Sequence, residues 1–371
     1  MLNEIYMQQA ISLAKKALGY TSPNPLVGAV IVKNDKIIGE GYHHKAGEPH
    51  AERMALANCK ESPFGATIYV TLEPCCHEGR TPPCTKALIE AGIKQVVIGS
   101  SDPNPLVKGK SVDLLRKSGI LVTEHYLEKE CDALNPIFFH YITTKMPYVA
   151  LKYAMTADGK IATATGASRW ISNETSRQNA HTLRHRYSSI LVGIGTVLQD
   201  DPLLNCRIEH ATQPLRIVCD TSLRIPLDSQ ICQTAKTYPT IIAYGKDPLS
   251  KKKHLEDLGL TLWELPIQNG QVSLTHLMEK LGTHGIDSVL VEGGGAIHFS
   301  LLEAILAQKL YIYLAPKIFG GMTAKTPVGG DGILETKDAF SLTLLTSQIL
   351  DGDILMEYEI NKKGGAQCLQ D

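Results

Sequence analysis

The segment TLEPCCHEGRTPPC, residues 71–84, constrains the fold most strongly, because it places three cysteines within ten positions while the other six are scattered singly. A disulfide, a metal site and chance are the three explanations. An odd total of nine cysteines, without the spacing of a disulfide framework, argues against disulfides. A metal site would require ligands from separate segments to converge, and this requirement restricts the folds available.

A histidine and a glutamate upstream extend the pattern. Enzymes that use zinc to deaminate nucleobases carry H-x-E followed by P-C-x-x-C, with one histidine and two cysteines as ligands and a glutamate that transfers protons without binding the metal. His50, Glu52, Pro74 and Cys75 match this pattern directly. His50 opens a helix that we predict for residues 50–59.

The second cysteine departs from the signature, because Cys84 lies nine positions after Cys75 where three are expected. The intervening loop contains a glycine and two prolines and can return Cys84 to the metal. With His50, Cys75 and Cys84 as ligands, the fourth tetrahedral position stays open to water, as in catalytic zinc sites. Zinc lowers the pKa of that water towards 7, and Glu52 can then carry its proton to the departing amine.

A purely structural zinc site is the alternative, and it requires four protein ligands. Cys76 or His77 could supply the fourth. We expect Cys75 rather than Cys76 to bind the metal, because Cys75 directly follows Pro74 as in the signature.

Helices and strands alternate along the first half of the chain, which is typical of a three-layer α/β unit. One predicted element is a long amphipathic helix over residues 127–143. Near Pro147 the pattern restarts with a β-rich run, and further strands separated by helices follow. We therefore predict two domains, residues 1–145 and 146–361, and a disordered tail, residues 362–371.

Composition and charge narrow the class of partner. The chain has 43% hydrophobic residues, 20% charged residues and a net charge of −1, without the basic surface typical of nucleic-acid binders. No apolar run reaches the roughly 18 residues that span a bilayer, and the N-terminus predicts an amphipathic helix rather than a secretory signal. We expect a cytoplasmic protein with reduced thiols that binds a small molecule, and neither nucleic acid nor membrane.

Together the motifs resemble the bifunctional deaminase/reductase family of riboflavin biosynthesis. SPNPLVGAVIV, HAE and TLEPCCHEGRTPPC carry the resemblance in the first half, and LKYAMTADGKIATATGASRWIS, VGIGTVLQDDPLLNCR and VEGGG carry it in the second, so that it covers about residues 1–360. The resemblance implies an N-terminal domain with a cytidine-deaminase-like three-layer α/β/α fold, followed by a dihydrofolate-reductase-like α/β domain. It also implies a homo-oligomer.

The resemblance further implies two reactions on phosphorylated aminopyrimidines. The first domain would use zinc to hydrolyse the exocyclic amine of 2,5-diamino-6-(5-phosphoribosylamino)pyrimidin-4(3H)-one. The second would use NADPH to reduce the ribosyl group of 5-amino-6-(5-phosphoribosylamino)uracil to ribityl.

Site residues carry over from the family position by position. In the first domain, the candidates for base and phosphate contacts are Asn24, His43, His77, Arg80 and Asn104, although His77, beside the metal, could equally support a metal ligand. In the second domain, the substrate positions are Ser168, Arg184, Leu204, Arg207 and Glu292. The NADPH positions are Ala154, Trp170, Thr196, Asp200, Thr221, Gly294, Gly295, Ala296, Ile297, His298, Phe299 and Ser300.

Two glycine turns in the second half indicate a nucleotide independently of the resemblance. SVLVEGGG, residues 288–295, is a strand followed by three glycines and a helix start, which can present backbone N–H groups to a pyrophosphate. GIGT, residues 193–196, is a second turn directly after a strand. One such turn fits a tight connection without a ligand equally well, but two in one domain favour nucleotide binding.

Lys152 and Asp200 are the ionisable residues that we consider for the mechanism of reduction. Lys152 could hydrogen-bond the opened sugar or protonate it as hydride arrives, and Asp200 could orient the sugar or have only a structural role. Hydride transfer itself depends mainly on proximity and on the cofactor. A substrate phosphate requires cations, and the resemblance implies that Arg184 and Arg207 bind it. Arg184 taken alone would be interpreted as a surface charge of the RHR segment 184–186.

Two other functions compete with the two-site enzyme. A nucleic-acid deaminase with an accessory binding domain is disfavoured, because aromatic residues do not alternate with Lys and Arg as single-strand stacking requires. A zinc-stabilised nucleotide-binding regulator without catalysis would leave Glu52 without a role.

Overall fold

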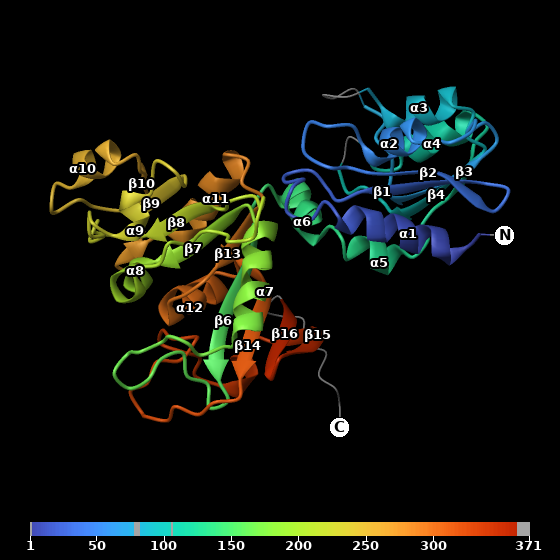
Figure 1. Ribbon diagram of the computed structural model, residues 1–371. Coiled ribbons are helices and arrows are strands. Elements are labelled where there is room, and N and C mark those ends of the chain that lie inside the picture. The colour runs from blue at the N-terminus through green and yellow to red at the C-terminus, as the bar shows by residue number, and fades with distance from the viewer. Residues whose placement is uncertain (1, 78–81, 105–106, 362–371) are drawn as a thin grey trace. The chain divides into compact units, whose positions relative to one another are not determined.

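The computed structural model describes residues 2–77, 82–104 and 107–361. The chain divides into two compact units, Met1–Lys145 and Met146–Asp371, and each has its own sheet and apolar core (Figure 1). The expected disordered tail lies outside the described residues. Within those described ranges, no helix is long and apolar enough to cross a membrane.

The first unit is built on a five-stranded mixed sheet of order β2-β1-β3-β4-β5. β1 pairs antiparallel with β2 and with β3, whereas β3, β4 and β5 run parallel. Asn34 and Asp35 join β1 to β2 with φ values of 49° and 59°, the conformation of a tight hairpin turn. The strands are β1 Gly28–Lys33, β2 Lys36–Tyr42, β3 Thr67–Leu72, β4 Gln95–Ser100 and β5 Leu121–Thr123.

Helices cover both faces of this sheet. α1 and α5 lie on one face, and α2, α3 and α4 lie on the other (Figure 1). The predicted three-layer α/β/α architecture is therefore confirmed. The helices are α1 Glu4–Lys15, α2 Ala51–Ala57, α3 Cys84–Glu90, α4 Lys110–Lys117, α5 Glu128–Asp132 and α6 Pro136–Thr144.

The long helix predicted for residues 127–143 is wrong, because α5 and α6 are separate. Pro136 begins α6, and a proline has no N–H to continue the hydrogen bonds of a preceding helix. The Asn135 side chain accepts from the Leu26 amide at 2.7 Å and donates to the Leu26 carbonyl at 2.9 Å. A buried pairing 109 positions apart therefore fixes the break.

Close packing of α2 on β2 sets the position of the metal-site motif. A Cβ atom on Gly41 would lie 2.6 Å from the carbonyl oxygen of Ala51, closer than real Cβ contacts. Only glycine therefore lets the first turn of α2 approach the sheet this closely. His50 precedes that turn and Glu52 lies within it.

The second unit contains a nine-stranded sheet of order β10-β9-β8-β7-β13-β6-β14-β16-β15. The strands from β10 to β14 in this order run parallel, and β16 and β15 add an antiparallel hairpin at one end. These strands are β6 Tyr148–Thr156, β7 Ser189–Gly193, β8 Leu215–Cys219, β9 Thr240–Tyr244, β10 Thr261–Glu264, β13 Ser288–Val291, β14 Ala307–Ala315, β15 Leu342–Leu350 and β16 Asp353–Ile360. A separate ribbon pairs β11 Ile267–Gln268 with β12 Gln271–Val272.

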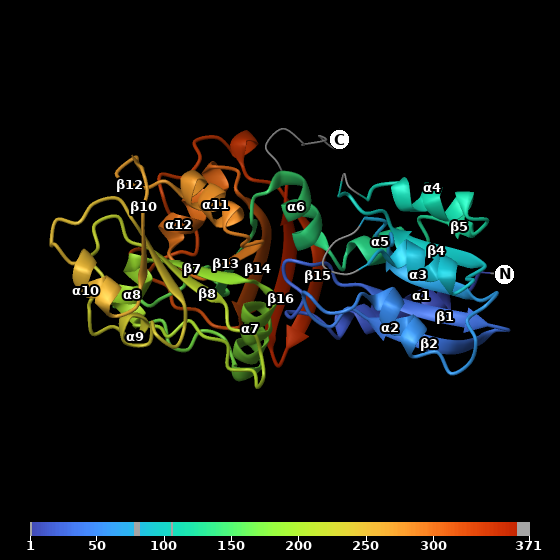
Figure 2. The ribbon, with the colours of Figure 1, turned by 90° about the horizontal axis from the view of Figure 1, so that it is seen from above.

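Helices also flank this sheet on both faces (Figure 2). α11 and α12 pack with the apolar cluster of one face, and α8, α9 and α10 pack with the cluster of the other. This arrangement agrees with the reductase-like α/β fold expected for the second half. The helices are α7 Glu174–Arg186, α8 Ile194–Asp200, α9 Gln230–Gln233, α10 Lys252–Asp257, α11 Leu274–Thr283, α12 Gly295–Glu303 and the 3-10 helix η1 Thr336–Asp338.

A fully buried arginine ties the strands of the second unit to their connections. Arg216 on β8 has no exposed surface. Its guanidinium donates to the hydroxyls of Thr240 and Thr234 and to three backbone carbonyl groups. One of these carbonyls belongs to Leu203, in the segment that follows α8, at 3.1 Å. Burial lowers the pKa of Arg216 to about 10, so the group is still charged at neutral pH.

We predict that Arg216→Met destabilises the second unit by at least about 3 kcal/mol, because it leaves several buried acceptors without donors. The two tryptophans of the chain, Trp170 and Trp263, both lie in this unit, so their fluorescence during urea unfolding measures the effect. Arg207→Met, at an exposed arginine, is the matched control and should change the unfolding free energy by less than about 0.5 kcal/mol. Equal effects of the two substitutions would contradict the role of Arg216.

Candidate active sites

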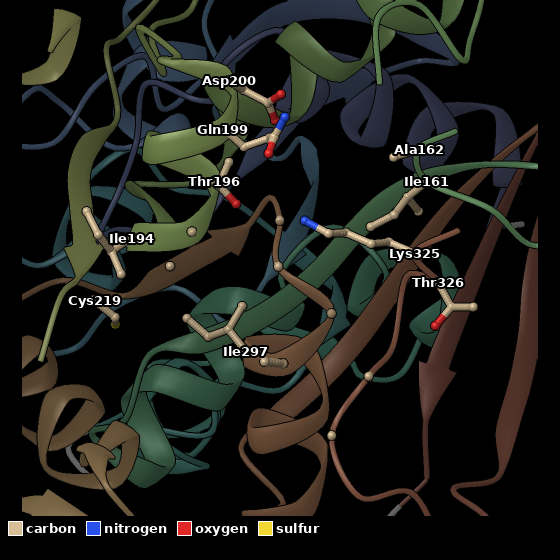
Figure 3. A pocket seen from close by; sticks show the side chains of 18 of the residues that line it. Ile161, Ala162, Ile194, Thr196, Gln199, Asp200, Cys219, Ile297, Lys325 and Thr326 are labelled. Carbon is tan, nitrogen blue, oxygen red and sulfur yellow. The ribbon is translucent and has the colours of Figure 1, made fainter. Parts of the chain in front are cut away.

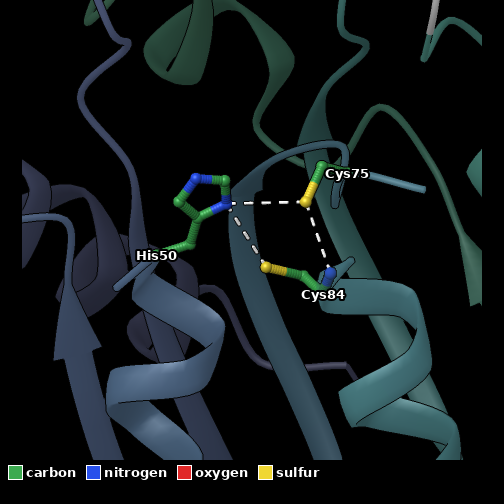
Figure 4. Close-up of side chains that lie close together, drawn as sticks. All are labelled: His50, Cys75 and Cys84. Atoms are coloured by element: carbon green, nitrogen blue, oxygen red, sulfur yellow. Dashed lines mark hydrogen bonds between the residues drawn. The ribbon is translucent and has the colours of Figure 1, made fainter. Parts of the chain in front are cut away.

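Three potential metal ligands from separate segments converge in the first unit. His50 precedes α2, Cys75 follows β3, and Cys84 is the first residue of α3. The His50 Nδ1 atom lies 3.5 Å from Cys75 Sγ and 3.4 Å from Cys84 Sγ (Figure 4). All three ligand atoms lie within 4.8 Å of one another.

These distances fit tetrahedral zinc. Bonds of about 2.3 Å to sulfur and about 2.0 Å to nitrogen place two tetrahedral ligand atoms about 3.5 Å apart. The Cys84 amide also donates to Cys75 Sγ at 3.3 Å, an outer hydrogen bond of the kind that orients metal ligands. Among the described residues, no fourth histidine, cysteine or carboxylate joins this group, so the arrangement matches an open, catalytic site.

Electrostatics inside the cluster favour a bound cation. The hydrogen bond from the Cys84 thiol lowers the pKa of Cys75 to about 4 and raises the pKa of Cys84. Glu52 is 3% exposed and lies beside Cys84. Burial raises the pKa of Glu52, which suits a group that must both accept and release a proton.

A cavity of about 370 Å³ opens beside the ligand cluster and includes Glu52 in its wall. Two predicted substrate residues form a hydrogen-bonded chain there. His43 Nδ1 lies 3.2 Å from the Pro49 carbonyl, and His43 Nε2 lies 3.1 Å from Asn24 Nδ2. Burial lowers the pKa of His43, so the ring is neutral and donates to Pro49 through Nδ1. Asn24 must then donate through Nδ2, which leaves its Oδ1 as an acceptor on the other side of the amide.

The remaining predicted residues of this site fall into two groups. His77 and Asn104 line the same cavity, and within the described ranges His77 Nδ1 is buried without a hydrogen-bond partner. Arg80 lies outside the described residues. Cys76 follows Cys75 but is not part of the ligand cluster.

Sequence reasoning missed Asp102, a buried carboxyl group in the wall of this cavity. Its Oδ1 accepts from the Asn104 amide at 2.8 Å, and its own amide donates to Glu73 at 3.3 Å. Burial raises the pKa of Asp102 to about 6. The sequence signal for it was its position directly after the buried strand β4, at the edge where ligands bind.

The second unit contains a larger cavity of about 1100 Å³. It lies where the parallel strands β8, β7 and β13 end, which is where open α/β sheets bind ligands. Gly293 and Gly294 have φ values of 125° and 89°, a conformation that residues with a side chain rarely adopt. They lead directly into α12. Thr196 and Ile297, both labelled in Figure 3, lie beside this turn, because a Cβ atom on Gly294 would be 3.5 Å from Ile297 Cγ2 and 3.9 Å from Thr196 Oγ1.

Most of the predicted cofactor positions divide between this cavity and the core. The cavity wall includes Thr196, Asp200, Thr221, Gly294, Gly295, Ala296 and Ile297, together with the predicted substrate residues Ser168 and Glu292. His298, Phe299 and Leu204 are buried. Trp170 is 59% exposed and stacks against Arg177 at 4.5 Å. Ala154, Ser300, Lys152, Arg184 and Arg207 do not line the cavity.

A buried ion cluster lies behind the cavity wall. Arg184 donates from Nε to Glu292 Oε1 at 2.7 Å and from Nη2 to Oε2 at 2.9 Å, and Lys152 Nζ is 3.5 Å from Oε2. Burial alone would raise the pKa of Glu292, but the positive charges of Arg184 and Lys152 outweigh burial and lower it. Glu292 is therefore ionised, and it holds both cations in fixed positions.

The ion cluster gives Arg184 and Lys152 partners inside the protein. Three nitrogens of Arg184 are engaged inside the protein, because Nη1 also donates to the Asn205 carbonyl at 2.9 Å. Lys152 pairs with Glu292, whereas Asp200 accepts from Ser168 Oγ at 3.1 Å. A partner 108 positions away cannot be inferred from local spacing.

The cavity also contains cations that sequence reasoning did not select. They are Lys160, Arg224 and Lys325. A cofactor with a pyrophosphate and a 2′-phosphate requires such charges. The residues present therefore fit NADPH, with backbone amides at the start of α12 and cations around them.

Comparisons with known proteins agree with this geometry. Residues 2–100 match the cytidine and deoxycytidylate deaminase zinc-binding region, and residues 147–356 match the RibD C-terminal domain.

Relatives match along nearly the whole chain. The riboflavin biosynthesis protein RibD of Actinobacillus pleuropneumoniae is 55% identical over 355 residues, which cover 96% of this chain and 94% of the relative. RibD of Escherichia coli is 39% identical over 334 residues, which cover 86% and 89%.

Solved structures agree as well. Acinetobacter baumannii RibD superposes with a TM-score of 0.86 at 39% identity, covering 97% of this chain and 99% of that one. The Thermotoga maritima diaminohydroxyphosphoribosylaminopyrimidine deaminase/5-amino-6-(5-phosphoribosylamino)uracil reductase superposes with a TM-score of 0.83 at 38% identity, covering 96% and 98%. The chain therefore belongs to the RibD family of riboflavin biosynthesis proteins.

Proposed function

We propose that residues 1–145 carry out the deamination, and residues 146–361 the reduction, of a bifunctional RibD enzyme with zinc and NADPH as cofactors. The first reaction hydrolyses the exocyclic amine of 2,5-diamino-6-(5-phosphoribosylamino)pyrimidin-4(3H)-one. The second reduces the ribosyl group of 5-amino-6-(5-phosphoribosylamino)uracil to ribityl. The observation that carries the proposal is the cluster of His50, Cys75 and Cys84 beside the buried Glu52.

In the deamination, His50, Cys75 and Cys84 would hold a zinc ion, which when bound would lower the pKa of a water molecule towards 7. Glu52 accepts the proton that this water loses and delivers it to the amine, which leaves as ammonia. Burial raises the pKa of Glu52, so that the carboxyl group can hold the proton between the two transfers. Asn24 Oδ1 is the atom that we assign to accept a hydrogen bond from the substrate ring, because Asn24 lines the cavity and His43 engages its Nδ2.

In the reduction, the glycine turn before α12 would provide amides for the pyrophosphate of NADPH, which when bound would supply the hydride. Lys152 is the group that we assign to donate a hydrogen bond or proton to the opened sugar, because its Nζ lies 3.5 Å from Glu292, a residue of the cavity wall that orients it. Asp200 and Ser168 form a second polar pair at the cavity. Arg207 is exposed and remains our candidate for the substrate phosphate.

We also propose that the enzyme is a homo-oligomer in which a second copy covers β15. This terminal strand has no charged residue in its nine positions. Pairing places Leu344 opposite Tyr358 and Ile349 opposite Ile354, on the face whose neighbouring residues pack into the apolar core. Leu344 and Ile349 are 53% and 77% exposed, and such a patch is typical of protein interfaces.

We place the protein in the cytoplasm. All eight cysteines in the described ranges are free thiols, and the proposed chemistry needs two of them reduced to bind zinc. A reducing compartment maintains that state.

We predict that Cys84→Ser loses both the metal and ammonia release, because a serine hydroxyl is a poor substitute for a thiolate ligand. Cys76→Ser is the matched control and should keep close to one zinc ion per chain, since Cys76 lies outside the ligand cluster. Elemental analysis of the purified variants measures the zinc content. Loss of zinc from the Cys76→Ser protein would show that our ligand assignment is wrong.

We predict that the two activities are separable. Glu52→Gln should reduce ammonia release by about 10²–10⁴-fold, the contribution of a positioned acid–base group, while zinc stays bound. NADPH-dependent reduction of substrate that is already deaminated should stay close to its original rate. Loss of both activities in a folded, zinc-loaded variant would refute two independent sites.

We predict that Ile349→Lys disrupts the oligomer, because it places a charge on the apolar face of β15. Thr346→Lys is the matched control, since Thr346 lies opposite Glu357 on the other face of the same strand. Light scattering after size-exclusion chromatography gives the mass of each variant. A monomeric parent protein, or an oligomer that is equally insensitive to both substitutions, would contradict the interface.

A further inference from the structure

We propose that Arg224 makes this reductase select NADPH over NADH, by binding the 2′-phosphate on the adenosine end of the cofactor. The proposal rests on the proposed function, in which NADPH occupies the cavity of the second unit. NADPH and NADH differ only in this phosphate, so a selective site needs a cation at the adenosine end that serves no other part of the cofactor.

The order of the strands indicates where the adenosine end lies. Residues at the ends of β8, β7 and β13 line the cavity, and β7 lies between the other two. Lys152, the group assigned to the opened sugar, lies on β6, and its partner Glu292 directly follows the neighbouring strand β13. The pyrophosphate is assigned to the glycine turn after β13. An extended dinucleotide with its nicotinamide near β6 therefore directs its adenosine towards β8.

Arg224 lies in the turn after β8. Its side chain is 56% exposed and lines the cavity. The Arg224 Nε atom is 3.7 Å from Asp220 Oδ1, beyond hydrogen-bond distance, so its N–H groups can bind a phosphate. A guanidinium group matches two phosphate oxygens with two parallel hydrogen bonds.

The turn that carries Arg224 is held in a fixed shape. Asp220 is fully buried, and its Oδ2 accepts from the Ile225 amide at 2.8 Å, which closes the turn over residues 220–225. Asp220 Oδ1 draws the guanidinium towards the turn. Asp220 is therefore a positioning residue for Arg224.

Hydroxyl groups accompany the cation. Thr221 and Ser222 also line the cavity. Thr221 Oγ1 accepts from the Val272 amide at 3.1 Å, so its own hydrogen is available to donate. One guanidinium and two hydroxyls within four consecutive residues form a donor set suited to a phosphate and not to an unmodified ribose.

The other two cations of the cavity belong to its opposite wall. The Ile161 amide donates to the Lys325 carbonyl at 2.9 Å, and Lys160 Nζ lies 3.5 Å from the Ala324 carbonyl. Figure 3 shows the Lys325 ammonium group projecting into the cavity, across from Ile194 and Cys219. The next segment reaches α12, because the Gly329 amide donates to the Gly295 carbonyl at 2.9 Å. Lys325 is thus suited to the pyrophosphate, which both cofactors share.

Because Lys325 is assigned to the pyrophosphate and Arg224 to the 2′-phosphate, a substitution of Lys325 is the matched control for one of Arg224. Arg224→Gln should weaken NADPH binding by roughly tenfold to a hundredfold, the effect of losing a charged hydrogen bond, and should change NADH binding less than about twofold. Lys325→Gln should weaken the binding of both cofactors by similar factors. Isothermal titration of the purified, unreacted protein measures these affinities without turnover. Titration with 2′,5′-ADP and with 5′-AMP tests the adenosine end alone, and only the former should respond to Arg224→Gln.

Arg224→Lys tests charge separately from shape and should keep part of the preference for NADPH. Unchanged tryptophan fluorescence and circular dichroism establish that each variant is folded. If Arg224→Gln leaves the ratio of NADPH to NADH affinity unchanged, the proposal is overturned while the cofactor site stands. If the parent protein binds neither nucleotide, the proposed function of the second unit fails, and the role of Arg224 fails with it.

Discussion

The imidazole nitrogen of His50 lies 3.4 and 3.5 Å from two cysteine sulfurs, and the chemistry of the first unit depends on this convergence. Two of the three ligands are held at helix starts, because His50 caps α2 and Cys84 is the first residue of α3, and Cys75 lies three residues after the buried strand β3. The contact of α2 with β2, which needs glycine at position 41, fixes the distance between the histidine and the sheet. Elements that are rigid for reasons of packing thus determine a spacing that suits zinc.

In the second unit, a buried ion cluster rather than a metal site holds charged side chains in fixed positions. Glu292 is buried, and it stays ionised because Arg184 and Lys152 supply two positive charges. Removal of one partner from such a cluster is expected to cost about 3–5 kcal/mol. The glycine turn after β13 begins directly after Glu292. Glu292, which orients Lys152, therefore adjoins the turn that is assigned to the cofactor.

Features that depend on residue type and on the local order of residues could be predicted from the sequence. His50, Glu52, Cys75 and Cys84 could be selected because few chemistries require that set, and the alternation of helices and strands indicated both α/β units. The break at Asn135 had a local signal in Pro136 that the helical pattern masked. The buried pairing with Leu26 that fixes the break could not be predicted, because it joins residues 109 positions apart. Asp102 and Arg224 were missed for the same reason: each becomes part of a site only when the strand before it is placed in its sheet.

The central claim is that three protein ligands hold a catalytic zinc with one position open. Zinc-edge X-ray absorption of the purified protein tests it most directly, because sulfur and nitrogen ligands scatter differently and their number can be determined. The expected result is two sulfur ligands at about 2.3 Å, one imidazole nitrogen and one further light ligand from water. A shell with three sulfurs would bring in another cysteine, such as Cys76. It would indicate a closed structural site and contradict the account.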